Sequence, residues 1–250
     1  MHQGHQVDLG GASPDIERLL AGLSAERIAA LGQARADLFE VIAACNARGV
    51  HPVREVMASG AQPFTRYEHY PPDDVDDAPA GYAWYYHAHE PGDSRPWEEH
   101  GHFHCYAYPK LLAHAEPLAS PPNGTPARDA AVSHLLGLCC SDRGVPNRIF
   151  TINRWASNEW LYPASDLLPL VERFALSDQL PHPRVSRWLS ALVRLLSPQI
   201  GVLLRERDRV LGEARARDPA GYAEDRALDI VSTFTFDLDT HLEAVGELIA

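Results

Sequence analysis

The chain has 250 residues, of which 45% are hydrophobic and 22% are charged, an ordinary composition for a globular protein with a substantial core. Its 34 acidic and 22 basic residues give a formal net charge of -12, which disfavours binding to the phosphate backbone of nucleic acids. Because the chain has no apolar run of about 18 residues, no secretory leader after Met1 and only four cysteines, we expect a cytoplasmic, bacterial protein without a membrane span or a disulfide scaffold.

The N-terminal third of the chain predicts a helical part followed by a loop. Residues 13–49 carry apolar side chains at helical spacing, which predicts a helical hairpin. Residues 50–81 contain five prolines and the acidic run 73–77, which together favour a solvated, Pro/Asp-rich loop.

The middle of the chain, residues 82–155, predicts a small antiparallel β-meander of four strands. We expect these strands at 82–89, 100–108, 132–140 and 148–155. The turn-forming segment 141–147 favours a hairpin between the last two strands. Residues 163–250 return to helical spacing, although Thr233–Phe236 is β-prone. The pattern therefore predicts a single α+β domain, with N-terminal and C-terminal helices around the sheet.

Five of the 13 histidines gather in this sheet segment, and they are His87, His89, His100, His102 and His104. Because side chains alternate along a strand, the last three should share one face and the first two a face of the preceding strand. A register that joins His89 to His100 also sets His87 opposite His102, with Cβ atoms about 4.5 to 5.5 Å apart. Two or three imidazoles at that separation can bind one metal ion, with nitrogen–metal distances of about 2.0 to 2.1 Å.

Other residues near the histidines could complete such a site. Glu90, Glu98 and Glu99 lie in or beside the connecting loop and could add an oxygen ligand, and His134 is a further candidate. Aromatic residues surround the cluster and favour a walled pocket over an open polar face. They are Tyr82, Trp84, Tyr85, Tyr86, Trp97, Phe103, Tyr106 and Tyr108.

The residue types restrict the candidate metal ions but do not identify a single one. Nitrogen ligands, alone or with a carboxylate, suit zinc, iron or copper. Two histidines and a carboxylate would indicate non-haem iron and oxygen chemistry, whereas three histidines and a water would indicate zinc and hydrolysis or hydration. Haem with an axial histidine, a metal-free catalytic histidine site, and histidines on an ordinary polar face stay open as alternatives.

Arg154 lies at the end of the fourth strand, where it could bind the carboxylate or phosphate of a small anionic substrate bidentately, or could pair with Glu159 or a nearby aspartate. If Cys140 lies opposite Arg148, then His134 lies opposite Arg154, which places the arginine near the histidines.

Three cysteines and one helical pair favour structural roles. Cys139 and Cys140 point to opposite faces of a strand, and Cys105 faces away from the histidines of its own strand, so all three are expected as reduced, buried residues. Asp237 and His241 are four residues apart on the last predicted helix, where they form a solvated pair or add a carboxylate to the histidine site.

Two short motifs resemble known families. His102-Phe103-His104 on a strand resembles the His-x-His of cupins, in which a glutamate follows; here 105–109 contains no carboxylate. His100 to Tyr106 resembles the histidine-triad motif, a resemblance that implies a nucleophilic His102 attacking a phosphorus centre.

A longer resemblance is to an uncharacterised bacterial family of unknown function. It is carried by His100–His104, Asp142–Pro146 and Thr151–Trp155. This resemblance implies no particular activity.

We therefore expect a metal-dependent enzyme, in the first instance an iron or copper oxidoreductase. His102 and His104 would be the main ligands and His87 or His89 the third, while Arg154 and His134 are the candidate catalytic residues. The alternatives are a metal-free phosphohydrolase or nucleotidyl transferase of histidine-triad type, and a non-catalytic metal-binding, haem-binding or structural protein.

Overall fold

The computed structural model describes residues 7–8, 16–60, 63–90, 97–122 and 132–250. Its helices are α1 Ile16–Ala21, α2 Ala25–Ala47, α3 Pro52–Met57, α4 Arg154–Ser157, α5 Ala164–Glu172, α6 Pro183–Leu195, α7 Ser197–Arg217 and α8 Leu238–Leu248. Its strands are β1 Val7–Asp8, β2 Tyr70–Asp77, β3 Tyr82–His87, β4 Gly101–Ala107, β5 Ser133–Cys140, β6 Pro146–Ile152 and β7 Ile230–Thr235. Short 3₁₀ turns, η2 Pro109–Leu112 and η3 Tyr222–Glu224, complete the described part of the chain, and the predicted α+β class is confirmed.

The strands form one sheet in the order β1-β7-β6-β5-β4-β3-β2. All pairs from β2 to β7 are antiparallel, and the two-residue β1 adds to β7 in parallel. The predicted meander of four strands corresponds to β3–β6. The strand count was wrong, because β2 extends the antiparallel sheet beyond β3 and β7 extends it beyond β6.

Residues 50–81 are not the uninterrupted loop that their prolines suggest. They contain α3 and also β2, in whose acidic run Asp73 and Asp76 are exposed while Asp77 is buried. Asp77 is buried because its carboxylate accepts hydrogen bonds from the backbone N–H groups of Ala80 (3.1 Å) and Ser177 (2.7 Å). The acidic side chains are therefore compatible with an edge strand, where one face meets solvent.

The prediction of continuous helix after residue 163 also fails at one place. Ile230–Thr235 forms β7, which pairs with β6. The β-prone Thr233–Phe236 was the local sign of this strand. At the other end of the chain, the hairpin predicted over 13–49 appears as α1 and α2, with Ser24 Oγ accepting from Arg27 N at the start of α2. Residues 13–15 lie outside the described part.

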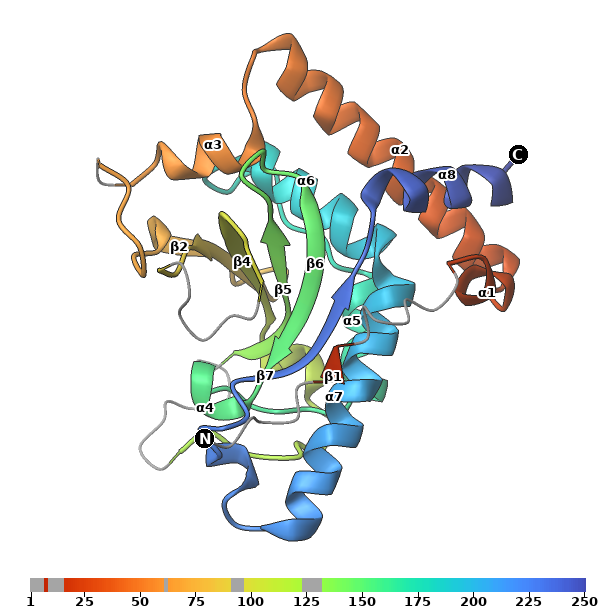
Figure 1. The fold of residues 1–250 in the computed structure, drawn as a ribbon. Coiled ribbons are helices and arrows are strands. Elements are labelled where there is room, and N and C mark those ends of the chain that lie inside the picture. The colour runs from red at the N-terminus through yellow and green to blue at the C-terminus, as the bar shows by residue number, and fades with distance from the viewer. Residues whose placement is uncertain (1–6, 9–15, 61–62, 91–96, 123–131) are drawn as a thin grey trace.

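Helices α2, α5, α6 and α7 gather on one side of the sheet (Figure 1). Trp84 and Phe103 point from β3 and β4 into this helical core, and Trp84 Nε1 donates to Ser186 Oγ of α6 at 3.1 Å. Since strand side chains alternate, His87 and His102 lie on the opposite face of the sheet. The fold thus separates an apolar core face from a histidine-bearing face.

None of the helices in the described ranges is both long enough and apolar enough to cross a bilayer.

Candidate metal centre

The pairing of β3 with β4 brings two histidines directly together. His87 lies opposite His102 and Tyr85 opposite His104, which confirms the predicted register at these positions. The Nε2 atoms of His87 and His102 are 2.7 Å apart, and the two rings meet edge to face. Two imidazole nitrogens this close either share a proton or bind the same cation.

His89 adds a third nitrogen to this pair. It follows the end of β3, and its ring lies 4.8 Å from that of His87 and 5.3 Å from that of His102. Ligand atoms of His87, His89 and His102 all lie within 4.8 Å of one another. His102 is fully buried, whereas His87 and His89 are partly exposed, so one side of the trio is accessible. This trio could hold a metal ion.

Glu99 orients the buried member of the trio. His102 Nδ1 donates to Glu99 Oε1 at 2.6 Å, which leaves the lone pair of His102 Nε2 directed at His87. Burial raises the pKa of the Glu99 carboxyl, but hydrogen bonds with His102, Cys139 and Trp97, and the positive charge that His102 carries whenever it is protonated, lower it to about 2. Glu99 is therefore an ionised carboxylate that fixes the His102 tautomer.

The other two glutamates considered as oxygen ligands lie elsewhere. Glu90 is exposed and forms an ion pair with Arg66 at 3.4 Å. Glu98 is exposed to solvent. Of these three glutamates, Glu99 is therefore the one that contacts the trio. Its carboxylate binds Nδ1 of His102, the ring nitrogen that does not face His87.

His104 and His134 form a second imidazole pair beside the trio. His104 Nδ1 lies 2.9 Å from His134 Nε2, and both side chains are buried. The His104 ring is 4.8 Å from His102 and 5.1 Å from His87. A multi-histidine group of four, His87, His89, His102 and His104, therefore lies on one face, with His134 at its inner end.

Glu159 lies behind His134 and is almost fully buried. Its Oε2 accepts a hydrogen bond from the backbone N–H of His134. Burial raises the pKa of the Glu159 carboxyl to about 8, although that hydrogen bond, Ser157, Arg207 and Arg154 act in the opposite direction. From the sequence this residue was only a possible ion-pair partner of Arg154, because an isolated glutamate carries no recognisable signal of its own.

A further histidine of this face, His69, was also missed. Its ring stacks on that of Tyr85 with centroids 3.8 Å apart, and it meets the His87 ring edge to face with centroids 5.7 Å apart. Its Nδ1 donates to Asp74 Oδ1 at 2.8 Å. His69 lies just before β2, in the segment predicted to be a loop, so its position beside β3 could not be inferred from strand alternation.

His100 does not join the other histidines. Its Nδ1 lies 2.5 Å from the hydroxyl of Tyr86, and its ring contacts Phe64, both on the helix side of the sheet. The prediction that His100 shares a face with His102 and His104 is wrong because β4 begins only at Gly101. Because Gly101 has no side chain, the Tyr86 hydroxyl fits beside it and forms the hydrogen bond with His100 Nδ1.

The predicted register between β5 and β6 is wrong by one residue. Cys139, not Cys140, lies opposite Arg148, and a bulge separates Cys139 from Cys140. Arg154 is consequently not opposite His134: β6 ends at Ile152, and Arg154 begins α4.

Arg154 is nonetheless buried close to the inner end of the histidine face. Its Nη2 pairs with Glu224 of η3, and its charge acts on Glu159, which binds the His134 backbone. Its Nε and Nη1 have no hydrogen-bond partner among the described residues.

None of the four cysteines, all of which lie in the described ranges, forms a disulfide, and all four are buried, as expected for Cys105, Cys139 and Cys140. Cys140 belongs to the helical core, whereas Cys139 packs with Phe150 on the histidine face.

The helical pair Asp237 and His241 does not add to this group. Asp237 caps α8 by accepting from Thr240 N at 2.8 Å. His241 is buried on the helix side, where its ring nitrogens contact Gln199 Nε2 (2.8 Å) and Leu195 O (2.9 Å).

Fold and site together define an α+β protein whose sheet carries a partly buried multi-histidine group able to hold a metal ion. A family model described as "Domain of unknown function (DUF6969)" matches residues 32–236, and the chain belongs to this family. The match includes both the histidine strands and the 142–155 segment, which confirms the expected membership of an uncharacterised family. No curated protein and no solved structure matches the chain.

Proposed function

We propose that this chain is a metal-dependent enzyme whose metal ion is bound by His87, His89 and His102. The observation that carries the proposal is the convergence of their ligand atoms within 4.8 Å, together with the Glu99 carboxylate on Nδ1 of His102. A carboxylate that holds the far nitrogen of a ligand histidine is the usual companion of a metal site.

Three protein ligands favour an enzyme over a structural metal site. Structural sites fill all four positions of a tetrahedral ion, whereas catalytic sites leave one for water or substrate. The partial exposure of His87 and His89 would give a small molecule access to that position. The trio supplies nitrogen donors only, which favours zinc, iron or copper over oxygen-preferring magnesium and calcium.

The identity of the metal would decide the reaction class. Iron or copper would support oxidoreductase chemistry, and zinc would support hydrolysis or hydration. The chain's own contribution is to hold the His102 tautomer through Glu99 and to keep the inner end of the site dry around His104 and His134.

Arg154 stays our candidate for orienting an anionic substrate. Its buried Nε and Nη1 atoms support this role, because buried donors normally have partners. We expect Arg154→Gln to leave the metal content unchanged and to weaken the binding of anionic substrate analogues. Equal binding of the analogue by both proteins would contradict the role.

The test of the metal site is the metal content of untagged protein, measured by mass spectrometry beside its absorption spectrum. We expect a stoichiometric metal ion that is lost in His102→Ala. Two matched variants should keep it: His100→Ala, because its ring lies on the helix side, and the exposed His114→Ala.

Two results would overturn the metal assignment. One is full metal content in a folded His102→Ala variant. The other is a folded wild-type protein that is metal-free and takes up neither zinc, copper nor ferrous iron. A Soret band would identify haem in place of a single ion.

A further inference from the structure

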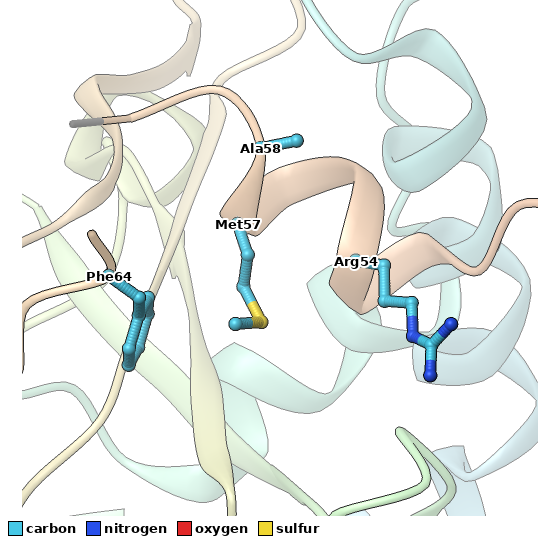
Figure 2. Close-up of a pocket in the computed structure, with 4 residues that line it drawn as sticks. All are labelled: Arg54, Met57, Ala58 and Phe64. Atoms are coloured by element: carbon cyan, nitrogen blue, oxygen red, sulfur yellow. The ribbon is translucent and has the colours of Figure 1, made fainter. Parts of the chain in front are cut away.

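A groove on the other side of the sheet is formed by two adjoining cavities beside α3. The first, of about 280 Å³, is lined by Arg54, Met57, Ala58 and Phe64 (Figure 2). The second, of about 220 Å³, shares Arg54 and Met57 with it and adds His51, His100, Asp142 and Arg143. We call these two cavities the α3 groove.

The α3 groove is distinct from the candidate metal centre. His100 lines it with the ring that contacts Tyr86 and Phe64, on the helix side. His102, two residues later, carries its ring on the opposite face. A molecule in the groove is therefore separated from the histidine trio by the sheet itself.

One end of the groove is cationic. Arg54 projects from α3 and Arg143 from the β5–β6 turn, and both are exposed. Within the described ranges neither guanidinium forms an ion pair with a carboxylate of this chain. Asp142 supplies one negative charge against these two positive ones. In a chain with a net charge of -12, two arginines at one groove that have no carboxylate partner among the described residues favour an anionic ligand.

The two histidines of the groove add neutral hydrogen-bonding groups. Burial lowers the pKa of His51, and Arg54 lowers it further. Burial also lowers the pKa of His100, with Asp142 opposing and Arg66 assisting that shift. Both imidazoles are therefore uncharged near neutral pH, and the positive charge belongs to the arginines.

The other end of the groove is apolar. Met57 and Phe64 line the first cavity, and Figure 2 shows the Phe64 ring beside the Met57 side chain, with Arg54 on the other side of Met57. The Phe64 ring is held in place by stacking on Tyr70, with centroids 4.8 Å apart. A ligand with an apolar body next to its charge would match both ends.

The wall that carries Arg143 is held in place by its own hydrogen bonds. In the turn, Gly144 N donates to Ser141 O at 2.7 Å and Val145 N donates to Ser141 Oγ at 3.2 Å. Gly144 has a φ of +77°, and a Cβ there would overlap the His51 ring. The turn therefore packs directly on His51 at the start of α3, and the groove is preformed.

We propose that the α3 groove binds a small organic anion, a monocarboxylate with a compact apolar or aromatic body. The arginines would hold the carboxylate by charge-assisted hydrogen bonds, and Met57 and Phe64 would cover the apolar body. The cavity volumes lie at or below the lower end of the range for small-molecule sites, about 300 Å³, which limits the ligand to roughly the size of benzoate.

The test is a calorimetric or NMR titration of chelator-treated protein with benzoate. Removing metal first keeps the carboxylate from engaging the histidine trio, so this test is independent of the proposed metal site. We expect saturable binding that falls about tenfold or more in Arg54→Gln and in Arg143→Gln. Arg209→Gln, an exposed arginine of α7, is the matched control and should bind as wild type does.

A second pair of probes tests the apolar end. Acetate and inorganic phosphate should bind more weakly than benzoate, and Phe64→Ala should reduce benzoate binding without changing that of acetate. The proposal is overturned if benzoate does not bind saturably, or if Arg54→Gln and Arg143→Gln bind it as wild type does. It is also overturned if phosphate binds as tightly as benzoate, or if His102→Ala rather than the arginine variants abolishes binding.

Discussion

At the scale of single residues, Glu99 decides the state of the histidine trio. Its carboxylate accepts a hydrogen bond from Nδ1 of His102 and another from Nε1 of Trp97 at 2.8 Å. This leaves Nε2 of His102 available on the side where His87 and His89 converge. A change at Glu99 should therefore alter metal affinity without removing any ligand.

We expect Glu99→Gln to weaken metal binding about 10- to 100-fold, because the amide keeps the shape but loses the charge that makes His102 a better ligand. The stoichiometry at saturating metal should not change. Competition with a chelator of known affinity measures the difference. The exposed Glu98→Gln is the control, and equal affinities of Glu99→Gln and wild type would show that Glu99 plays no part in metal binding.

Glu159 should make the stability of the protein depend on pH. Its pKa is raised from 4.5 to about 8 in the folded chain, so the folded state holds this proton more tightly than the unfolded state does. The resulting stability is fully present below the unfolded pKa and is lost as the pH rises through about 8. The loss should be on the order of 1 kcal/mol per pH unit between these pKa values.

Replacing Glu159 with glutamine should remove this slope. Urea unfolding of metal-free protein at several pH values between about 5 and 8 gives the free energy of unfolding for each variant. The difference between Glu159→Gln and wild type should shift in favour of the variant as the pH rises. A difference that does not vary with pH would mean that the carboxyl is already ionised in the folded chain.

At the scale of elements, β5 and β6 meet closely on the histidine face. Gly137 of β5 lies opposite Phe150 of β6, and the Phe150 ring occupies the space above the glycine. The centroid of the same ring lies 5.1 Å from that of the His102 ring and 5.7 Å from that of the His104 ring. The absence of a side chain at Gly137 thus determines where the apolar wall of the site lies.

We expect Gly137→Ala to destabilise the protein by about 1–3 kcal/mol, because the new methyl group must displace the Phe150 ring. Metal affinity should also fall, since that ring packs on two of the histidines. Gly212→Ala in α7 is the matched control: it adds the same methyl group in open space and should stabilise by about 0.5–1 kcal/mol. Equal free energies of unfolding for the two variants would contradict this account.

At the scale of the whole molecule, one core joins distant parts of the chain. It runs from Leu20 in α1 through Leu38 in α2 and Trp84 in the sheet to Val245 in α8. Figure 1 shows α8 lying against α2, where Arg35 Nε donates to Leu242 O at 2.9 Å. This continuity predicts that the helices and the sheet unfold together.

Leu38→Ala should lower the free energy of unfolding by about 2–5 kcal/mol, since the side chain is fully buried. Within each of the two proteins, wild type and Leu38→Ala, tryptophan fluorescence and far-ultraviolet circular dichroism should report one common unfolding midpoint. Two separate transitions would show that the sheet and the helices are independent units.

Local patterns were enough for much of the fold. The helical spacing of apolar residues over 13–49 and after residue 163 predicts helices that each bury one face, and α2, α6 and α7 confirm it. Strand alternation put His87 and His102 on faces that can meet, and the register considered from the sequence set them opposite each other, as they are in the sheet. The segments that form β2 and β7 were wrongly predicted as loop and helix, because their strand character depends on their neighbours in the sheet rather than on local sequence.

The sequence alone determined the α+β class, the central strands and the presence of a histidine-rich face. Only the tertiary structure decided which histidines meet: it turned His100 to the helix side, brought His69 across from a segment without a pattern, and set Glu99 behind His102. The physical reason is the distance along the chain over which the deciding interactions act. Alternation is a property of one strand, whereas a binding site depends on bulges, strand ends and loops whose geometry is set by long-range packing.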